Sequence, residues 1–278
     1  MSDASTCADS GDRQYATGVA RAFGGALLFS LPILMTMETW QLGFYMDRWK
    51  LVCLLVMMLP LLVGLAYYLG FEDSTNLFDA AVDAFVAIAV AAVLAAALLY
   101  LFGALSLRTS IDEWIGKVAL QTMAGSIGAL LAQSQFGSSN ADNDKRREGG
   151  DFAEYFFMAA GAVFLGANVA PTEEVVLIAH RMTSWHTLGV ILVSLLVMHA
   201  FVYALDFRGQ HERAAEQSFS SEFLRFTMVG YLIALAISVY ICWSFGRFDG
   251  LPVSVALQIS VVLAFPASVG AAAARLVL

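Results

Sequence analysis

Long apolar segments separated by short polar ones set the pattern along this chain. Each apolar segment is about 20 residues or longer, the length that a helix needs to cross a hydrocarbon core of about 30 Å. The segments are residues 21–46, 51–70, 79–105, 114–133, 152–178, 187–204, 223–245 and 251–276. The pattern predicts an all-α, polytopic membrane protein with about eight transmembrane helices.

The first and the fifth of these segments each contain a proline and are longer than the bilayer requires. Residues 21–46 read as one helix with a kink at Pro32, and the fifth segment reads as a helix that continues to Pro171 or on to about Ile178. A proline has no amide hydrogen, so Pro171 frees a main-chain carbonyl around Ala167 or Asn168. We therefore expect a broken helix near Pro171.

The polar segments suggest how the chain is divided. Residues 1–20 are rich in Ser, Asp, Ala and Gly and predict a flexible cytoplasmic tail, and residues 134–151 predict a linker. A charged loop at 206–216 separates the sixth and seventh segments. The linker divides the apolar part into a first four-helix unit, 21–133, and a second, 152–278.

The two four-helix units align with each other at an offset of 136 residues. The matched positions are Gly25 and Gly161, Thr36 and Thr172, Glu38 and Glu174, and Trp49 and Trp185. After a slip of one residue, the string Val-Ala-Leu-Gln at 118–121 matches the same string at 255–258. Because each unit holds an even number of spans, we expect a parallel internal repeat, related by a pseudo-twofold axis along the membrane normal.

Composition agrees with a membrane protein and excludes several classes of function. Only 14% of the residues are charged, against roughly 25% in soluble domains. The net charge of −8 and the lack of a basic stripe argue against a nucleic-acid partner. No catalytic or phosphate-binding motif and no metal spacing of cysteines is visible. We therefore expect no enzyme activity and no cofactor, and the identity of any bound metal ion stays open.

The distribution of basic residues suggests an orientation. Nine lysines and arginines fall on the side of the termini and six on the other side. By the positive-inside rule, we expect both termini to lie in the cytoplasm. We expect the protein itself to lie in the cell (inner) membrane.

The candidate chemistry centres on two glutamates flanked by apolar sequence, Glu38 and Glu174. Acids inside a membrane usually face a cavity or a partner and mark ion or proton pathways. With Glu173, they would form an ion-binding or protonatable site, and neutral oxygens would come from Thr36, Thr172 and Asn168. The alternative is that the first and fifth helices end at these positions, so that the glutamates lie among the lipid headgroups.

Four further polar residues are candidates for lining a pathway. Asp79 and Asp83 share one helical face and would attract cations, although acids in a first turn also simply stabilise the helix N-terminus. Gln121 and Gln258 lie inside spans, where hydrogen bonding between helices competes with pore lining.

Two stretches carry a resemblance to known families. Gly24 to Trp40, with its Met37-Glu38-Thr39-Trp40, and Gly166 to Glu174 resemble an uncharacterised bacterial family of multi-pass integral membrane proteins. The stretch Gly166-Ala-Asn-Val-Ala-Pro-Thr-Glu173 is also similar to the signature of cation/calcium exchangers. It differs by having Thr172 between the proline and the acid, and by lying in a parallel rather than an inverted repeat.

These observations support two function hypotheses. The first is a cation or proton transporter or channel that uses the glutamate pair, with the lipid bilayer and a small cation or proton as partners. The alternative is a membrane scaffold or assembly partner that transports nothing and whose polar residues only pack helices.

Overall fold

The computed structural model describes residues 3–69, 76–136, 140–209 and 223–277. Within these ranges the chain forms helices and no strand. Eight helical segments are long and apolar enough to cross a membrane: Thr17–Leu34, Arg48–Leu69, Leu77–Leu101, Ile111–Ala132, Gly150–Val169, Ser184–Phe201, Phe226–Ser244 and Val253–Arg275. The prediction of an all-α protein with eight spans is confirmed. Most of the charged loop at 206–216 lies outside the described residues.

The chain divides into two compact units, which are described separately. Unit 1 comprises residues 1–45 and 55–148, and unit 2 comprises residues 46–54 and 149–278. Each unit therefore contains the greater part of four of the eight spans.

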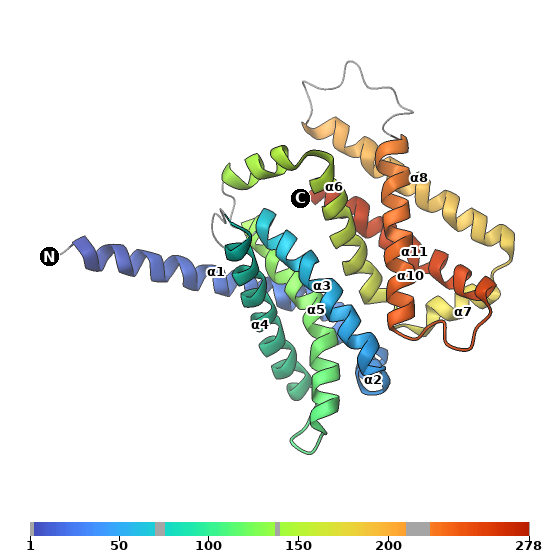
Figure 1. Ribbon diagram of the computed structural model, residues 1–278, viewed down its shortest axis with the longest axis horizontal. Helices are drawn as coiled ribbons and strands as arrows, with labels where there is room; N and C mark the ends of the chain where they lie inside the picture. Colours follow the sequence, from blue (N-terminus) through green and yellow to red (C-terminus); the bar gives the residue numbers. More distant parts are fainter. Residues whose placement is uncertain (1–2, 70–75, 137–139, 210–222, 278) are drawn as a thin grey trace. The chain divides into compact units, whose positions relative to one another are not determined.

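Unit 1 is organised around its last helix. In chain order its helices are α1 (Asp3–Leu34), α2 (Met37–Tyr45), α3 (Arg48–Leu69), α4 (Leu77–Leu101) and α5 (Ile111–Phe136). Helix α5 packs against α1, α2 and α4 (Figure 1). As a result, 78% of its membrane span is buried within the protein, so α5 is the core helix of the unit.

Unit 2 has a similar order of elements. These are α6 (Asn140–Val169), α7 (Glu173–Arg181), α8 (Ser184–Gly209), the π-helical turn η1 (Phe223–Met228), α10 (Val229–Ser244) and α11 (Val253–Val277). Helix α11 packs against α7, α8 and α10. Only 11% of the span in α8 is buried, so most of that helix is available to lipid.

Each unit has a close helix crossing between glycines. A Cβ at Gly25 of α1 would overlap the carbonyl oxygen of Gly128 in α5, and a Cβ at Gly161 of α6 would overlap that of Gly270 in α11. Small residues of this kind let membrane helices approach closely enough to gain van der Waals contact. The first and last helices of each unit thus meet at glycines.

These crossings bear on the predicted alignment of the last helices. Gly25 and Gly161 agree with the offset of 136, but Gly128 and Gly270 are 142 residues apart. The glutamines of the two Val-Ala-Leu-Gln strings also have different surroundings, because Gln121 donates to Ile33 in the first unit whereas Gln258 donates to Met182 in the second. The internal repeat therefore stays a prediction.

The first and fifth spans are shorter than predicted. The helix expected over 21–46 ends at Leu34, and the one expected to reach about Ile178 ends at Val169. A separate helix of nine residues follows each of them, α2 and α7. In the fifth span the cause is Pro171, which cannot donate the next helical hydrogen bond. In the first span Thr36 leaves the helix and bonds back to Pro32.

The polar segments also contain helix. Helix α1 begins at Asp3 and runs through the expected tail, where no proline interrupts the sequence before Pro32. Helix α6 begins at Asn140, inside the expected linker, and breaks at Gly150, whose φ of 52° and ψ of −140° are a conformation that glycine adopts readily.

Two adjacent glycines test the crossing of α1 with α5. Gly25→Ala should lower the free energy of unfolding by about 1–3 kcal/mol, because the new methyl group overlaps α5. Gly24→Ala is the control, since nothing lies within 4 Å of its Cβ position and alanine favours the helix. Unfolding in mixed micelles, followed by circular dichroism, measures both. Equal stability of the two variants would contradict the close crossing.

Candidate functional site

The end of α1 is a break in the helix of unit 1. The chain turns at Met35 and Thr36 before α2 begins at Met37. The Thr36 amide donates to Ile33 O at 3.3 Å, and its hydroxyl donates to Pro32 O at 2.7 Å. The last carbonyls of α1 therefore cannot all be satisfied by the following helical turn.

Two side chains from α2 and α5 bond these carbonyls. The indole Nε1 of Trp40 donates to Leu34 O at 2.9 Å, and the amide Nε2 of Gln121 donates to Ile33 O at 3.3 Å. An unsatisfied carbonyl in the hydrocarbon region costs several kcal/mol, so these bonds make the break tolerable in a membrane. Leu34 itself packs in a buried cluster with Leu99 and Leu105, against which Trp40 is packed.

The break in unit 1 also contains two buried oxygens with no hydrogen-bond donor in the described part of the chain. They are Oγ1 of Thr39 and Oε1 of Gln121, and each residue is only 1% exposed. Buried polar atoms in folded proteins nearly always have a partner, and those that do not call for a ligand, a water or an ion. The break is therefore a candidate binding position.

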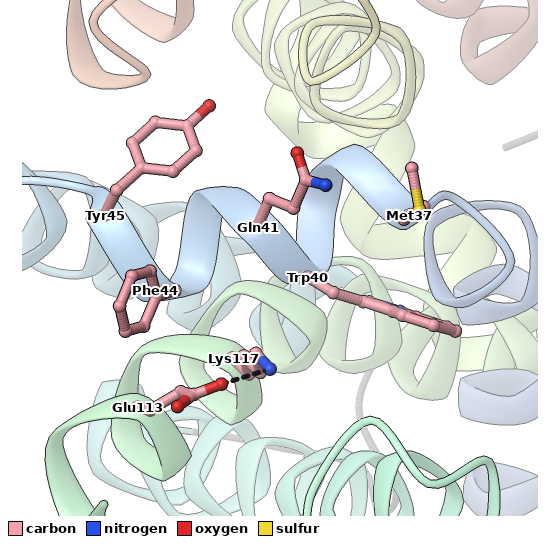
Figure 2. Close-up of a pocket in the computed structure, with 7 residues that line it drawn as sticks. All are labelled: Met37, Trp40, Gln41, Phe44, Tyr45, Glu113 and Lys117. Atoms are coloured by element: carbon pink, nitrogen blue, oxygen red, sulfur yellow. Dashed lines mark ion pairs between the residues drawn. The ribbon is translucent and has the colours of Figure 1, made fainter.

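A hollow lies beside this break, between α2 and the start of α5. It has a volume of about 420 Å³ and is lined by Met37, Trp40, Gln41, Phe44, Tyr45, Glu113 and Lys117. Figure 2 shows Trp40 and Phe44 on the side of α2 that faces Glu113 and Lys117. Glu113 and Lys117 form an ion pair one turn apart on α5, and the Lys117 ammonium also donates to Ala104 O at 2.9 Å.

Helix α2 can lie this close to α5 because Gly43 faces it. A Cβ at Gly43 would lie 2.7 Å from the Cα of Lys117. Met37 and Tyr45 point away from α5 and are exposed (Figure 2).

The end of α6 is the corresponding break in unit 2. Pro171 is buried there, and Thr172 is the N-cap residue of α7 with an extended backbone, φ −73° and ψ 147°. The Thr172 hydroxyl donates back to Val169 O at 2.8 Å. The amide of Asn168 donates to Phe164 O at 2.7 Å, and its Oδ1 is buried without a donor among the described residues.

An arginine bonds the last carbonyls at this second break. Arg247, in the turn between α10 and α11, donates its Nε to Ala170 O at 3.1 Å and its Nη2 to Pro171 O. The residue is half-buried. The carbonyl end of a helix carries a partial negative charge, so a guanidinium there is electrostatically favourable.

The structure places the three predicted glutamates at the start of short helices. Glu38 is the second residue of α2 and is half-buried, whereas Glu173 and Glu174 occupy the first turn of α7 and are exposed. Acids in the first turn stabilise a helix through its dipole, which gives all three a structural role. Glu38 belongs to unit 1 and Glu174 to unit 2, and their pairing stays a prediction.

The remaining candidates are placed as follows. Thr36 lies at the first break, and Asn168 and Thr172 lie together at the second. Asp79, in the first turn of α4, is exposed, and Asp83, one turn later, is half-buried. Gln121 and Gln258 each donate an amide hydrogen at 3.3 Å to a carbonyl of another element, Ile33 O and Met182 O.

Sequence reasoning did not assign a role to Arg247, Thr39 or the Glu113–Lys117 pair. Arg247 is one of the six basic residues on the side opposite the termini, and it is the single basic residue between the seventh and eighth apolar segments. The pair carried a readable signal, since opposite charges four residues apart share a helical face. Thr39 carried none, because nothing in its neighbours indicates burial.

A comparison with known families gives the class of the protein. The chain belongs to the family described as "Putative integral membrane protein (DUF2391)", which matches residues 18–278 and so covers both units. This confirms the expected multi-pass membrane family. No curated protein and no solved structure matches the chain.

The role of Arg247 can be tested by removing its charge and its donors. Arg247→Met should lower the free energy of unfolding by about 2 kcal/mol, because two carbonyls lose bonds to a charged donor. It should also speed hydrogen exchange in α7, which begins directly after those carbonyls.

The matched control is Arg181→Met, an exposed arginine in the last turn of α7. It should change stability by no more than about 0.5 kcal/mol. If both variants unfold alike and exchange alike, Arg247 does not hold the break together.

Proposed function

We propose that the protein moves a small cation, or protons, across the membrane. The observation that carries this proposal is that both units interrupt their first membrane helix and leave buried side-chain oxygens at the interruption. Transporters use such discontinuous helices because freed carbonyls and polar side chains can replace the water around an ion.

Acids beside the breaks suit cation transport. Glu38 lies four residues after Leu34 and Glu174 five residues after Val169, each in the first turn of the short helix that follows the broken span. Carboxylates at such positions raise the local concentration of cations. Protons displaced from them by an arriving cation would couple the two movements.

Alternating access would come from movement of one unit against the other. Two features support this proposal, namely the division of the chain into two compact units and the matching order of helices within them. The internal repeat would then be functional as well as structural. The excess of basic residues on the side of the termini supports an orientation with both termini in the cytoplasm and the protein in the cell membrane.

Flux through proteoliposomes tests the function. Purified protein should conduct protons or one of a panel of mono- and divalent cations, and Glu38→Gln together with Glu174→Gln should reduce that flux at least tenfold, the effect of about 1.4 kcal/mol. Asp47→Asn is the control, because it also removes one exposed carboxylate while asparagine can still cap the start of α3, where Asp47 accepts the Trp49 amide at 2.8 Å.

Either of two results would contradict the proposal in distinct ways. Flux equal to that of protein-free liposomes, with folded protein confirmed by circular dichroism, would contradict the transport function. Normal flux in the double glutamine variant would leave transport standing and remove the glutamates from the site.

A further inference from the structure

We propose that the break between α1 and α2 binds a dehydrated monovalent cation through Thr39 Oγ1 and Gln121 Oε1, and that Arg247 is the fixed counterpart of this cation in unit 2. The inference rests on the proposed function, because it locates the ion that transport would require. It differs from the sequence-based site, which placed the ion on the two glutamates.

The orientation of Gln121 is fixed by its hydrogen bond. Ile33 O is an acceptor, so the group that faces it at 3.3 Å must be the NH₂ and not the oxygen of the side-chain amide. Oε1 is bonded to the same carbon atom and therefore lies beside the end of α1. It is buried there and receives no hydrogen bond from the described residues.

Thr39 approaches the same place from α2. The two helices touch where Gly43 meets Lys117. Thr39 lies one helical turn before Gly43 in α2, and Gln121 lies one helical turn after Lys117 in α5. Both residues are therefore displaced from that contact towards the end of α1. Gln121 reaches Ile33 O, and Trp40, the neighbour of Thr39, reaches Leu34 O. Both unsatisfied oxygens therefore lie on residues next to the end of α1, and the proposed cation would bind between them.

The charges around this position favour a cation over a water molecule. The last carbonyls of α1 are the negative end of a helix dipole, and Glu38 is adjacent to Thr39. The nearest basic residue on α5, Lys117, is paired with Glu113 and donates to Ala104 O in the turn before α5. Its charge is thus already compensated.

The comparison with unit 2 supplies an independent argument. Leu34 and Ala170 are matched by the offset of 136 residues, and the carbonyl of each accepts a side-chain hydrogen bond at the end of the first span of its unit. In unit 2 the donor is a guanidinium, and in unit 1 it is a neutral indole. The partial negative charge at the end of the first span is thus compensated by a permanent positive side chain in unit 2. In unit 1 a bound cation would compensate it.

The available ligands select a monovalent ion. Calcium and magnesium sites are built largely from carboxylates and waters. Across the described ranges, no three His, Cys, Asp or Glu side chains come together. Neutral hydroxyl and amide oxygens, with one acid nearby, suit the lower charge density of Na⁺ or K⁺.

Cation-dependent thermal stability of the full-length protein in detergent tests this inference. In N-methyl-D-glucamine nitrate of constant ionic strength, added Na⁺, K⁺ or Tl⁺ as the nitrate should raise the melting temperature in a saturable manner. Thr39→Val and Gln121→Leu should each weaken the apparent affinity at least tenfold. Unchanged affinity in both variants, or the same response to every salt including N-methyl-D-glucamine, would overturn the site.

The control is Thr122→Val, next to Gln121 on α5. Its hydroxyl donates within its own helix to Val118 O at 2.7 Å, so its removal should leave cation affinity within twofold of the wild type. Loss of affinity in Thr122→Val as well would show a general effect of α5 substitutions and would overturn the assignment.

Unit 2 offers a second arm. Arg247→Met removes the fixed charge and should lower the melting temperature. Added Na⁺ or K⁺ should then restore part of this loss, both in Arg247→Met alone and in the double variant Arg247→Met with Thr39→Val. No recovery would overturn the claim that Arg247 is the counterpart of the ion. Saturable cation binding without any flux would contradict the proposed function and support the site. Flux that is unchanged in Thr39→Val and in Gln121→Leu would contradict the site and support the proposed function.

Discussion

Main-chain carbonyls at the end of a membrane helix must find a donor, and this requirement governs both helix breaks of the protein. In water the last carbonyls of a helix are solvated, but in hydrocarbon they are costly unless the protein satisfies them. Trp40 and Gln121 do so at the end of α1, and Arg247 does so at the end of α6. The donors come from α2, from α5 and from the turn before α11. These bonds thereby tie the ends of α1 and α6 to other elements of their own units.

The same requirement links the fold to the proposed function. A helix can end inside a membrane protein only where polar groups gather, and gathered polar groups are what an ion needs when it loses its water. Unit 1 leaves two buried side-chain oxygens without a partner among the described residues at its break, and unit 2 has a guanidinium bonded to the carbonyls at its own break. Each unit ends its first span at a break that a nine-residue helix follows, and the two breaks differ in the charge of the side chain that bonds them.

The fold could be predicted from the sequence because hydrophobic length is a strong signal. Spans such as Leu77–Leu101 allow no reading other than a membrane helix. The breaks were placed less well. Apolar residues of the short helices, such as Leu42 and Val175, looked like continuations of the spans, although they are buried on separate helices. Pro171 predicted one break, but no local sequence feature predicted that α1 ends at Leu34.

The contents of the breaks depend on contacts between residues far apart in the chain. Arg247 lies 77 residues from Ala170, and Gln121 lies 88 residues from Ile33. Gln121 reaches Ile33 only because α5 packs against α1, and Arg247 reaches Ala170 only because the turn before α11 lies at the end of α6, so a single sequence cannot reveal these pairs. Glu38 and Glu174 drew attention because acids in apolar sequence are conspicuous, whereas Thr39 is inconspicuous and more deeply buried.

A structure determined in the presence of Tl⁺ would test the central claim most directly, because the anomalous scattering of this ion locates a monovalent cation without reference to the protein density. The account predicts one peak at the end of α1, in contact with Thr39 Oγ1 and Gln121 Oε1, and none beside Arg247 at the end of α6. No peak in unit 1, or a peak at the end of α6 with Arg247 in place, would contradict it.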